Sequence, residues 1–278
     1  MEIMLLILSA TLTYVMKPYL RQLLIESGMI GKNYENKEIP VGMGLLLIPI
    51  MTIQLFLIQA IYPFYFKVER FQLNVLLLFF IGILMMAFLG LLDDTVGSRD
   101  TLGFKGHLGQ LVRGRLTTGG LKAVLGGLTA LLISSILSSS IIELILNTLL
   151  LGLFTNLINL LDLRPGRAMK GYISLLMVFL ILGITYESRI IFFTILGYCI
   201  VYLPQDLRAE YMMGDVGSNT LGMTLGIMSM LSFSSIVKYL LLFILIIIHM
   251  IAEKYSISKI IDGNSILRFI DNLGRKTH

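Results

Sequence analysis

The sequence has no tryptophan, a single cysteine, three histidines and only 14% charged residues. One cysteine, Cys199, cannot form a disulfide within the chain. The histidines and the cysteine do not cluster, which excludes a zinc site of the usual kind. The low charge excludes an ordinary soluble domain, in which about 25% of residues are charged. Without tryptophan, only tyrosine is left to form the aromatic belts of a membrane protein.

Hydrophobic residues make up 56% of the chain and recur in long runs. Because a helix needs about 20 apolar residues to cross a bilayer, the sequence predicts an all-α, polytopic membrane bundle of about nine transmembrane helices. The predicted spans are 2–22, 41–63, 72–92, 119–138, 141–161, 170–186, 188–204, 216–233 and 236–253. They form one domain over residues 1–253, and a basic tail follows at 254–278.

Positive charge gathers on one predicted side of the membrane. With nine spans and an external N-terminus, 18 of the 22 lysines and arginines fall in inner segments. The positive-inside rule therefore predicts an N-terminus outside and a cytoplasmic C-terminus. The expected location is the plasma membrane, with the site on its cytoplasmic face. The net charge of +5 then reflects loops that face anionic lipids or substrates, so no nucleic-acid partner is expected.

Acidic residues occur at the cytoplasmic ends of three spans that do not follow one another. Asp93 and Asp94 end the third span, Asp162 ends the fifth and Asp215 opens the eighth. Acids are costly near a membrane core, and paired acids raise each other's pKa. A cation should compensate them, either a hard metal ion such as Mg²⁺ or a nearby lysine or arginine.

Each of these patterns also has a purely structural explanation. An acid pair can be a solvated helix end, and Asn156 and Asn159 can simply join helices inside the bundle. Gly214 can belong to an ordinary turn before a span. The basic loop 95–122 can be nothing more than a topology signal. Their occurrence together, in order and on one face, favours a phosphate-handling site instead.

Five motifs resemble the polyprenyl-phosphate N-acetylhexosamine-1-phosphate transferases, the glycosyltransferase family 4 that includes phospho-N-acetylmuramoyl-pentapeptide transferase. They are "IPVGMGL" at 39–45, "LLDD" at 91–94, "FKGHLGQ" at 104–110, "NLINLLD" at 156–162 and "MGDVGS" at 213–218. The resemblance implies a transferase that moves a HexNAc-1-phosphate from a UDP-sugar to polyprenyl (undecaprenyl) phosphate. This would be the first membrane step of a cell-envelope polymer. The implied cofactor is Mg²⁺, with Mn²⁺ as an alternative.

The resemblance also implies roles for single residues. Asp93, Asp94 and Asp215 would be catalytic, and Asp215 and Asp94 would bind the metal. Whether Asp93 acts as base or nucleophile stays open. The implied substrate-binding residues are Lys105, Asn156, Asn159, Asp162, Arg164, Arg167, Gly214 and Ser218.

Two segments depart from the family pattern. The family continues "DGLDGLA" where this chain has "DLRPGRA" at 162–168, which adds Arg164 and Arg167. The family's histidine-rich loop before the last helix is not apparent. The tail instead predicts a short amphipathic helix that Asn264 caps and Gly274 ends, lying on the membrane surface.

These departures keep other functions open. A catalytically silent member of the family would bind a lipid phosphate or a nucleotide in a regulatory role. A transporter is a third interpretation, because acids within membranes also mark ion pathways. It fits less well, since the acids lie on one face and not along a path. A homodimer is an open alternative for the assembly.

Overall fold

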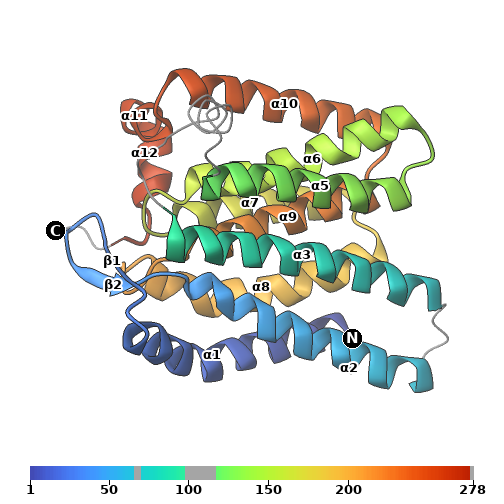
Figure 1. Ribbon diagram of the computed structural model, residues 1–278, viewed down its shortest axis with the longest axis horizontal. Coiled ribbons are helices and arrows are strands. Elements are labelled where there is room, and N and C mark those ends of the chain that lie inside the picture. The colour runs from blue at the N-terminus through green and yellow to red at the C-terminus, as the bar shows by residue number, and fades with distance from the viewer. Residues whose placement is uncertain (66–69, 98–116, 276–278) are drawn as a thin grey trace.

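The computed structural model describes residues 1–65, 70–97 and 117–275 as a helical bundle (Figure 1). The long helices are α1 (Glu2–Glu26), α2 (Leu47–Tyr65), α3 (Arg70–Val96), α5 (Thr118–Leu137), α6 (Ile141–Leu161), α7 (Arg167–Leu182), α8 (Tyr186–Asp206), α9 (Gly214–Ser232) and α10 (Ser235–Lys254). Two short helices, α11 (Ile257–Gly263) and α12 (Ser265–Asn272), complete the C-terminus. Each predicted span coincides with one of the long helices.

Seven of these helices are long and apolar enough to cross a membrane: α1, the η1–α2 segment, α3, α5, α6, α8 and α10, over the described part of the chain. The helical class and a multi-pass membrane protein are therefore confirmed. The crossing of α7 and α9, and with it the count of nine, stays a prediction. So do the external N-terminus and the cytoplasmic C-terminus.

Helix α9 lies at the centre of the bundle and packs on α6, α3, α8 and α7. Every residue from Val216 to Met230 is buried. A Cβ on Gly222 or Gly226 would meet the α6 backbone at Thr155 or Leu151, so these glycines allow the two helices to approach closely. Because protein surrounds it on all sides, α9 needs little hydropathy. This explains why α9 is less hydrophobic than a typical transmembrane helix.

Helix α7 is too short to cross a bilayer without a tilt or a thinner membrane. Its 16 residues measure about 24 Å, against about 30 Å for the hydrocarbon core. Gly166 precedes it and Gly183 follows it, both at positive φ. Its inward residues Met169, Tyr172 and Leu176 are fully buried in the main core.

A two-stranded hairpin is a minor addition to the helical bundle that the sequence did not predict. Strands β1 (Ile30–Lys32) and β2 (Glu38–Pro40) pair antiparallel between α1 and the 3₁₀ helix η1 (Met43–Leu46). The Asn33 side chain accepts the backbone N–H groups of Glu35 and Lys37 and thereby closes the hairpin loop. These strands are too short for their alternation to be distinguished in the sequence. The second predicted span, 41–63, begins with η1 at Met43 and continues as α2 from Leu47.

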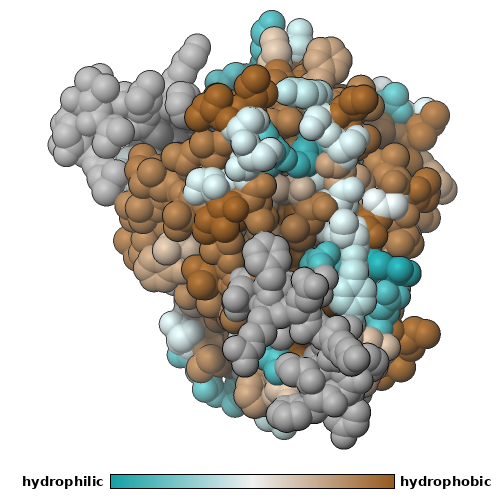
Figure 2. All heavy atoms as spheres, turned by 90° about the vertical axis from the view of Figure 1, so that its right-hand side faces the viewer, coloured by the Kyte–Doolittle hydropathy of each residue, from teal (hydrophilic) through white to brown (hydrophobic). Residues whose placement is uncertain are grey.

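Many large apolar side chains are exposed on the bundle, and Figure 2 shows broad hydrophobic areas on one of its faces. On α10, Leu240, Phe243 and Ile244 are all exposed, and Leu128 and Leu132 are exposed on α5. A soluble protein would bury such residues, whereas a membrane protein presents them to lipid.

Two helices of the bundle begin with a side-chain cap. The Thr117 side chain accepts the Gly120 N–H at the start of α5, and the Ser140 side chain accepts the Glu143 N–H at the start of α6.

Candidate active site

The C-terminal end of α3 meets the N-terminal end of α9. The Asp94 carboxylate accepts the backbone N–H of Asp215 at 2.9 Å and that of Val216 at 3.1 Å. The first N–H groups of a helix have no partner within it, and the helix dipole favours a negative charge there. Asp94 therefore caps α9 and fixes the backbone of Asp215.

Two glycines make this approach of α3 and α9 possible. A Cβ on Gly90 would lie 2.5 Å from the Asp215 carbonyl. Gly214 has φ +75°, a conformation that L side chains rarely adopt, and its Cβ would lie 2.5 Å from Asp94 Oδ2. The "LGLLDD" and "MGDVGS" segments thus fit together without room for any other residue at these positions.

Lys122, near the start of α5, joins Asp93 to Asp215. Its Nζ lies 3.5 Å from Asp93 Oδ2 and forms a close ion pair with Asp215 Oδ2. All three side chains are partly buried, which weakens solvent screening of their charges. The two adjacent acids on α3 therefore have different partners: Asp94 binds backbone, and Asp93 shares a cation with Asp215.

The segment that opens with "IPVGMGL" supports the same helix end from the other side. Met43 N–H donates to Met212 O at 3.1 Å, and Gly44 N–H donates to Met213 O at 2.9 Å. A Cβ on Gly44 would overlap the Gly217 backbone, so η1 and α9 pack in direct contact. This contact holds the turn that leads to Asp215.

Helix α6 contributes the third predicted acid site. Ser218 Oγ donates to Asn159 Oδ1 at 3.0 Å and so links α6 to α9, while Asn156 one turn earlier is exposed. Asp162 follows the last residue of α6. Burial raises its pKa well above the usual value, and the charges of Asp206, Asp215 and Asp94 raise it further. The hydrogen bond between Ser218 and Asn159 therefore brings the end of α6 to the start of α9, where Asp215 lies.

The two arginines of "DLRPGRA" lie in different surroundings. Arg164 is exposed, and its guanidinium lies 5.8 Å from the ring centre of Tyr34 in the β1–β2 loop. Arg167 is buried and bound to Asp271 and Ser258 of the tail. Its substrate-binding role stays a prediction, and its described contacts are structural. Lys105, with the rest of "FKGHLGQ", lies outside the described residues.

A magnesium ion is compatible with this set of residues. Among the described residues, no group of three or more His, Cys, Asp or Glu side chains converges as a ready-made metal site. Asp93 and Asp215 already share a cation, the Lys122 ammonium. Mg²⁺ typically takes one or two carboxylates and completes its shell with waters and substrate phosphates. Asp93 and Asp215 would hold it, whereas Asp94 uses both of its oxygens on backbone N–H groups.

Lys122 is the residue that sequence reasoning missed. The sequence placed it at the edge of the basic loop 95–122, without a role of its own. The only available signal was its position at the start of the helix that follows the acid pair. Asp206 was also missed: it is buried at the end of α8 and accepts the Gly166 N–H.

Replacing Lys122 tests whether this place binds a cation. In Lys122→Met, Asp93 and Asp215 face each other without compensation, which should cost about 1–2 kcal/mol and lower Tm by about 3–6 °C. Added Mg²⁺ should then raise the Tm of this variant more than that of the wild type, because binding stabilises the folded state. Lys259→Met, on the exposed side of α11, is the matched control. Equal Mg²⁺ responses in all three proteins would argue against a metal here.

These features define a class: a multi-pass membrane protein with carboxylates, amides and a lysine gathered at one end of its central helix. The profile of the family described as Glycosyl transferase family 4 matches residues 76–233, more than half of the chain. The chain belongs to this family and is therefore a membrane transferase. A search of the curated proteins found no significant match.

Proposed function

We propose that the protein transfers a HexNAc-1-phosphate from a UDP-sugar to polyprenyl phosphate at the cytoplasmic face of the plasma membrane. An oxygen of the lipid phosphate attacks the sugar-bound phosphorus of the donor. The bond to the UMP oxygen breaks, UMP leaves, and a polyprenyl-diphospho-sugar remains. This reaction would begin the assembly of a cell-envelope polymer.

The observation that carries the proposal is the shared cation position between Asp93 and Asp215. Both substrates are anionic, so their mutual repulsion has to be offset before they can react. Phosphoryl transfer depends mainly on positioning and charge neutralisation. A partly buried, cation-binding carboxylate pair at a helix end is suited to that task.

The residues around this carboxylate pair would have separate roles in the transfer. Asp94 holds the start of α9, so that Asp215 keeps its place. Lys122 and Arg164 would offset the negative charge of the substrate phosphates. The exposed Asn156 would donate a hydrogen bond to the UDP-sugar. A lipid phosphate is already mostly dianionic at pH 7, because its second pKa is about 6. Asp93 therefore has little need to act as a base and would mainly orient the acceptor.

Magnesium, when bound by Asp93 and Asp215, would neutralise charge on the phosphate oxygens. The carboxylates would be freed for this role when the Lys122 side chain turns towards the substrate phosphates. The Lys122 ammonium and Mg²⁺ compete for the same oxygens, so Lys122 would offset the repulsion between the two carboxylates until substrate binds.

The direct test is a donor panel. Purified protein in lipid vesicles is given undecaprenyl phosphate, Mg²⁺ and radiolabelled UDP-HexNAc donors, and the organic phase is analysed for labelled lipid. We expect one donor to yield labelled lipid, with UMP released in equal amount. Folded protein that yields no labelled lipid from any donor would contradict the proposal.

A second candidate is a catalytically silent member of the family that binds a lipid phosphate or nucleotide. The favouring observation is Arg167, which is bound by the tail and so not directed to a donor. In this case UMP would not be released, although isothermal titration would detect donor binding. An Asp215→Asn variant would then leave the cellular phenotype unchanged.

A further inference from the structure

Helix α12 buries an acidic side chain and exposes its apolar ones. Its one buried residue is Asp271, with 6% of its surface exposed. The large apolar side chains of α12 and of Leu273, which follows it, are all exposed: Ile266, Leu267, Phe269, Ile270 and Leu273. Four of them, at 266, 269, 270 and 273, share one face by helical spacing. A helix in water would be arranged the other way round.

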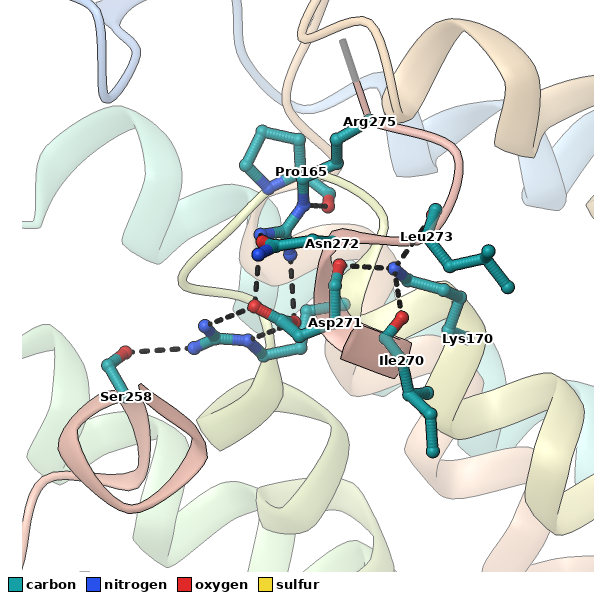
Figure 3. A network of polar contacts seen from close by, with 9 residues as sticks. Pro165, Lys170, Ser258, Ile270, Asp271, Asn272, Leu273 and Arg275 are labelled. Carbon is teal, nitrogen blue, oxygen red and sulfur yellow. Dashed lines mark hydrogen bonds and ion pairs between the residues drawn. The ribbon is translucent and has the colours of Figure 1, made fainter. Parts of the chain in front are cut away.

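The buried Asp271 holds two arginines at once (Figure 3). Its oxygens accept Arg167 Nε at 2.8 Å and Nη2 at 2.9 Å, and Arg275 Nη2 at 2.8 Å and Nη1 at 2.9 Å. Burial alone would raise the pKa of Asp271, but hydrogen bonds to Arg167 and Arg275 lower it to about 2. The carboxylate is therefore ionised throughout the physiological pH range. Paired forks of this kind fix geometry as well as charge.

Further contacts join the end of the tail to Pro165, before α7, and to Lys170 in the first turn of α7. Arg275 Nε donates to Pro165 O at 2.7 Å. Lys170 Nζ donates to the carbonyls of Ile270 at 2.9 Å and Leu273 at 3.2 Å, and also to that of Asp271. A lysine in this position satisfies the free carbonyls at the end of a helix. Every one of these contacts links the tail to residues 165–170.

The segment 162–167 is closely confined as a result. Gly166 adopts φ +71°, and a Cβ there would overlap Leu207. A Cβ on Gly274, after α12, would also contact Leu207, at 3.0 Å. Leu207 therefore packs against both the segment and the tail. Movement of α12 would be transmitted to the segment that starts with Asp162.

The tail that carries α12 begins at the end of a lipid-facing helix. This helix is α10, whose exposed apolar side chains are typical of a helix in contact with lipid, and α11 stands between it and α12. Lys254 and Tyr255 at the end of α10 are both exposed, as expected at a membrane interface. Lys259 and Arg268 on the short helices are exposed as well and would meet anionic headgroups. These features identify the lipid leaflet as the occupant of the apolar face.

We propose that α12 is seated in the lipid of the inner leaflet and that Asp271 acts from there as a positioning residue for the transfer. Through Arg167 and Arg275 it holds the 162–167 segment, and with it Asp162, against the nucleotide-sugar. The catalytic part of this proposal depends on the proposed function. The placement of α12 in lipid does not depend on the proposed function. Arg167, on this proposal, fixes the segment and does not bind the donor.

The positioning role is tested with Asp271→Asn, which keeps shape and removes the charge. We expect the KM for the UDP-sugar to rise about tenfold, with the KM for the lipid phosphate unchanged, because a displaced segment affects only the donor. A purely structural role would reduce the amount of folded enzyme and leave both KM values as they are. Asp271→Glu should restore most of the donor affinity. Asp262→Asn, exposed on α11, is the matched control. An unchanged donor KM in Asp271→Asn would overturn the positioning role.

The placement of α12 in lipid is tested separately by fluorescence. Since the chain has no tryptophan, Phe269→Trp provides a single reporter on the apolar face of α12. In vesicles, lipids brominated near the headgroup should quench it strongly, and lipids brominated near the chain end should quench it weakly. Phe243→Trp on α10 is the reference for a residue in contact with lipid. Strong quenching by acrylamide with no effect of brominated lipid would overturn the placement of α12 in lipid. This measurement remains decisive even if no donor is transferred and the proposed function fails.

Discussion

Asp215→Asn is expected to abolish nearly all transfer while the protein stays folded. The substitution removes a charge from the pair that shares a cation, so kcat/KM should fall on the order of a hundredfold to a thousandfold. The fold should be kept because Asp94 binds the backbone N–H of residue 215 and not its side chain. The measurement is labelled-lipid formation per amount of folded protein, with folding followed by thermal denaturation.

The control for this variant is Asp262→Asn, which makes the same chemical change on the exposed part of α11. It should leave both activity and Tm unchanged. If Asp215→Asn retains more than about a tenth of the wild-type rate, the carboxylate pair is not the centre of the reaction. The proposed mechanism would then have to be rebuilt around other residues.

The positions of the long helices could be predicted from hydropathy alone. Runs of about 20 apolar residues leave little choice in a bilayer, because every backbone group has to be satisfied within its own segment. Each of the nine predicted spans accordingly coincides with one helix. What hydropathy could not decide is whether α7 and α9 cross, since α7 is short and α9 is shielded by other helices.

The composition of the candidate site could be predicted, but the partners within it could not. The sequence predicted Asp93, Asp94, Asp162 and Asp215 on one face of the membrane, and hydrogen bonds join the ends of α3 and α6 to the start of α9. Asp93 and Asp94 have different partners because adjacent residues of α3 point in different directions around the helix axis. The rotation of α3 about that axis is decided by close contacts at Gly90 and Gly214, which no local pattern records.

The tail shows the same limit. Asn264 does cap α12 through the N–H groups of Ile266 and Leu267, and Gly274 does follow its end with φ +78°, as predicted. These are local signals within a few residues. The binding of Asp271 to Arg167 joins positions 104 apart in the chain. An isolated aspartate in an amphipathic helix gives no indication of such a partner.

Gly44→Ala is expected to impair both stability and activity. Its Cβ would overlap the backbone of Gly217, and neither η1 nor α9 can yield without moving the other. Overpacking of this kind costs about 1–3 kcal/mol, or about 3–9 °C in Tm for a chain of this size. Because Gly44 N–H also donates to Met213 O, the displacement should reach Asp215 and reduce the rate of transfer.

Gly127→Ala makes the matched comparison, because nothing lies within 4 Å of the Cβ it would add on α5. There the same substitution should be neutral or raise stability by a few tenths of a kcal/mol, since alanine favours a helix. Thermal denaturation of the two variants side by side would separate close packing from helix propensity. Equal Tm values would mean that η1 and α9 are not in contact in the membrane. The support of Asp215 by residues 39–45 would then have to be abandoned, although its cap by Asp94 would stand.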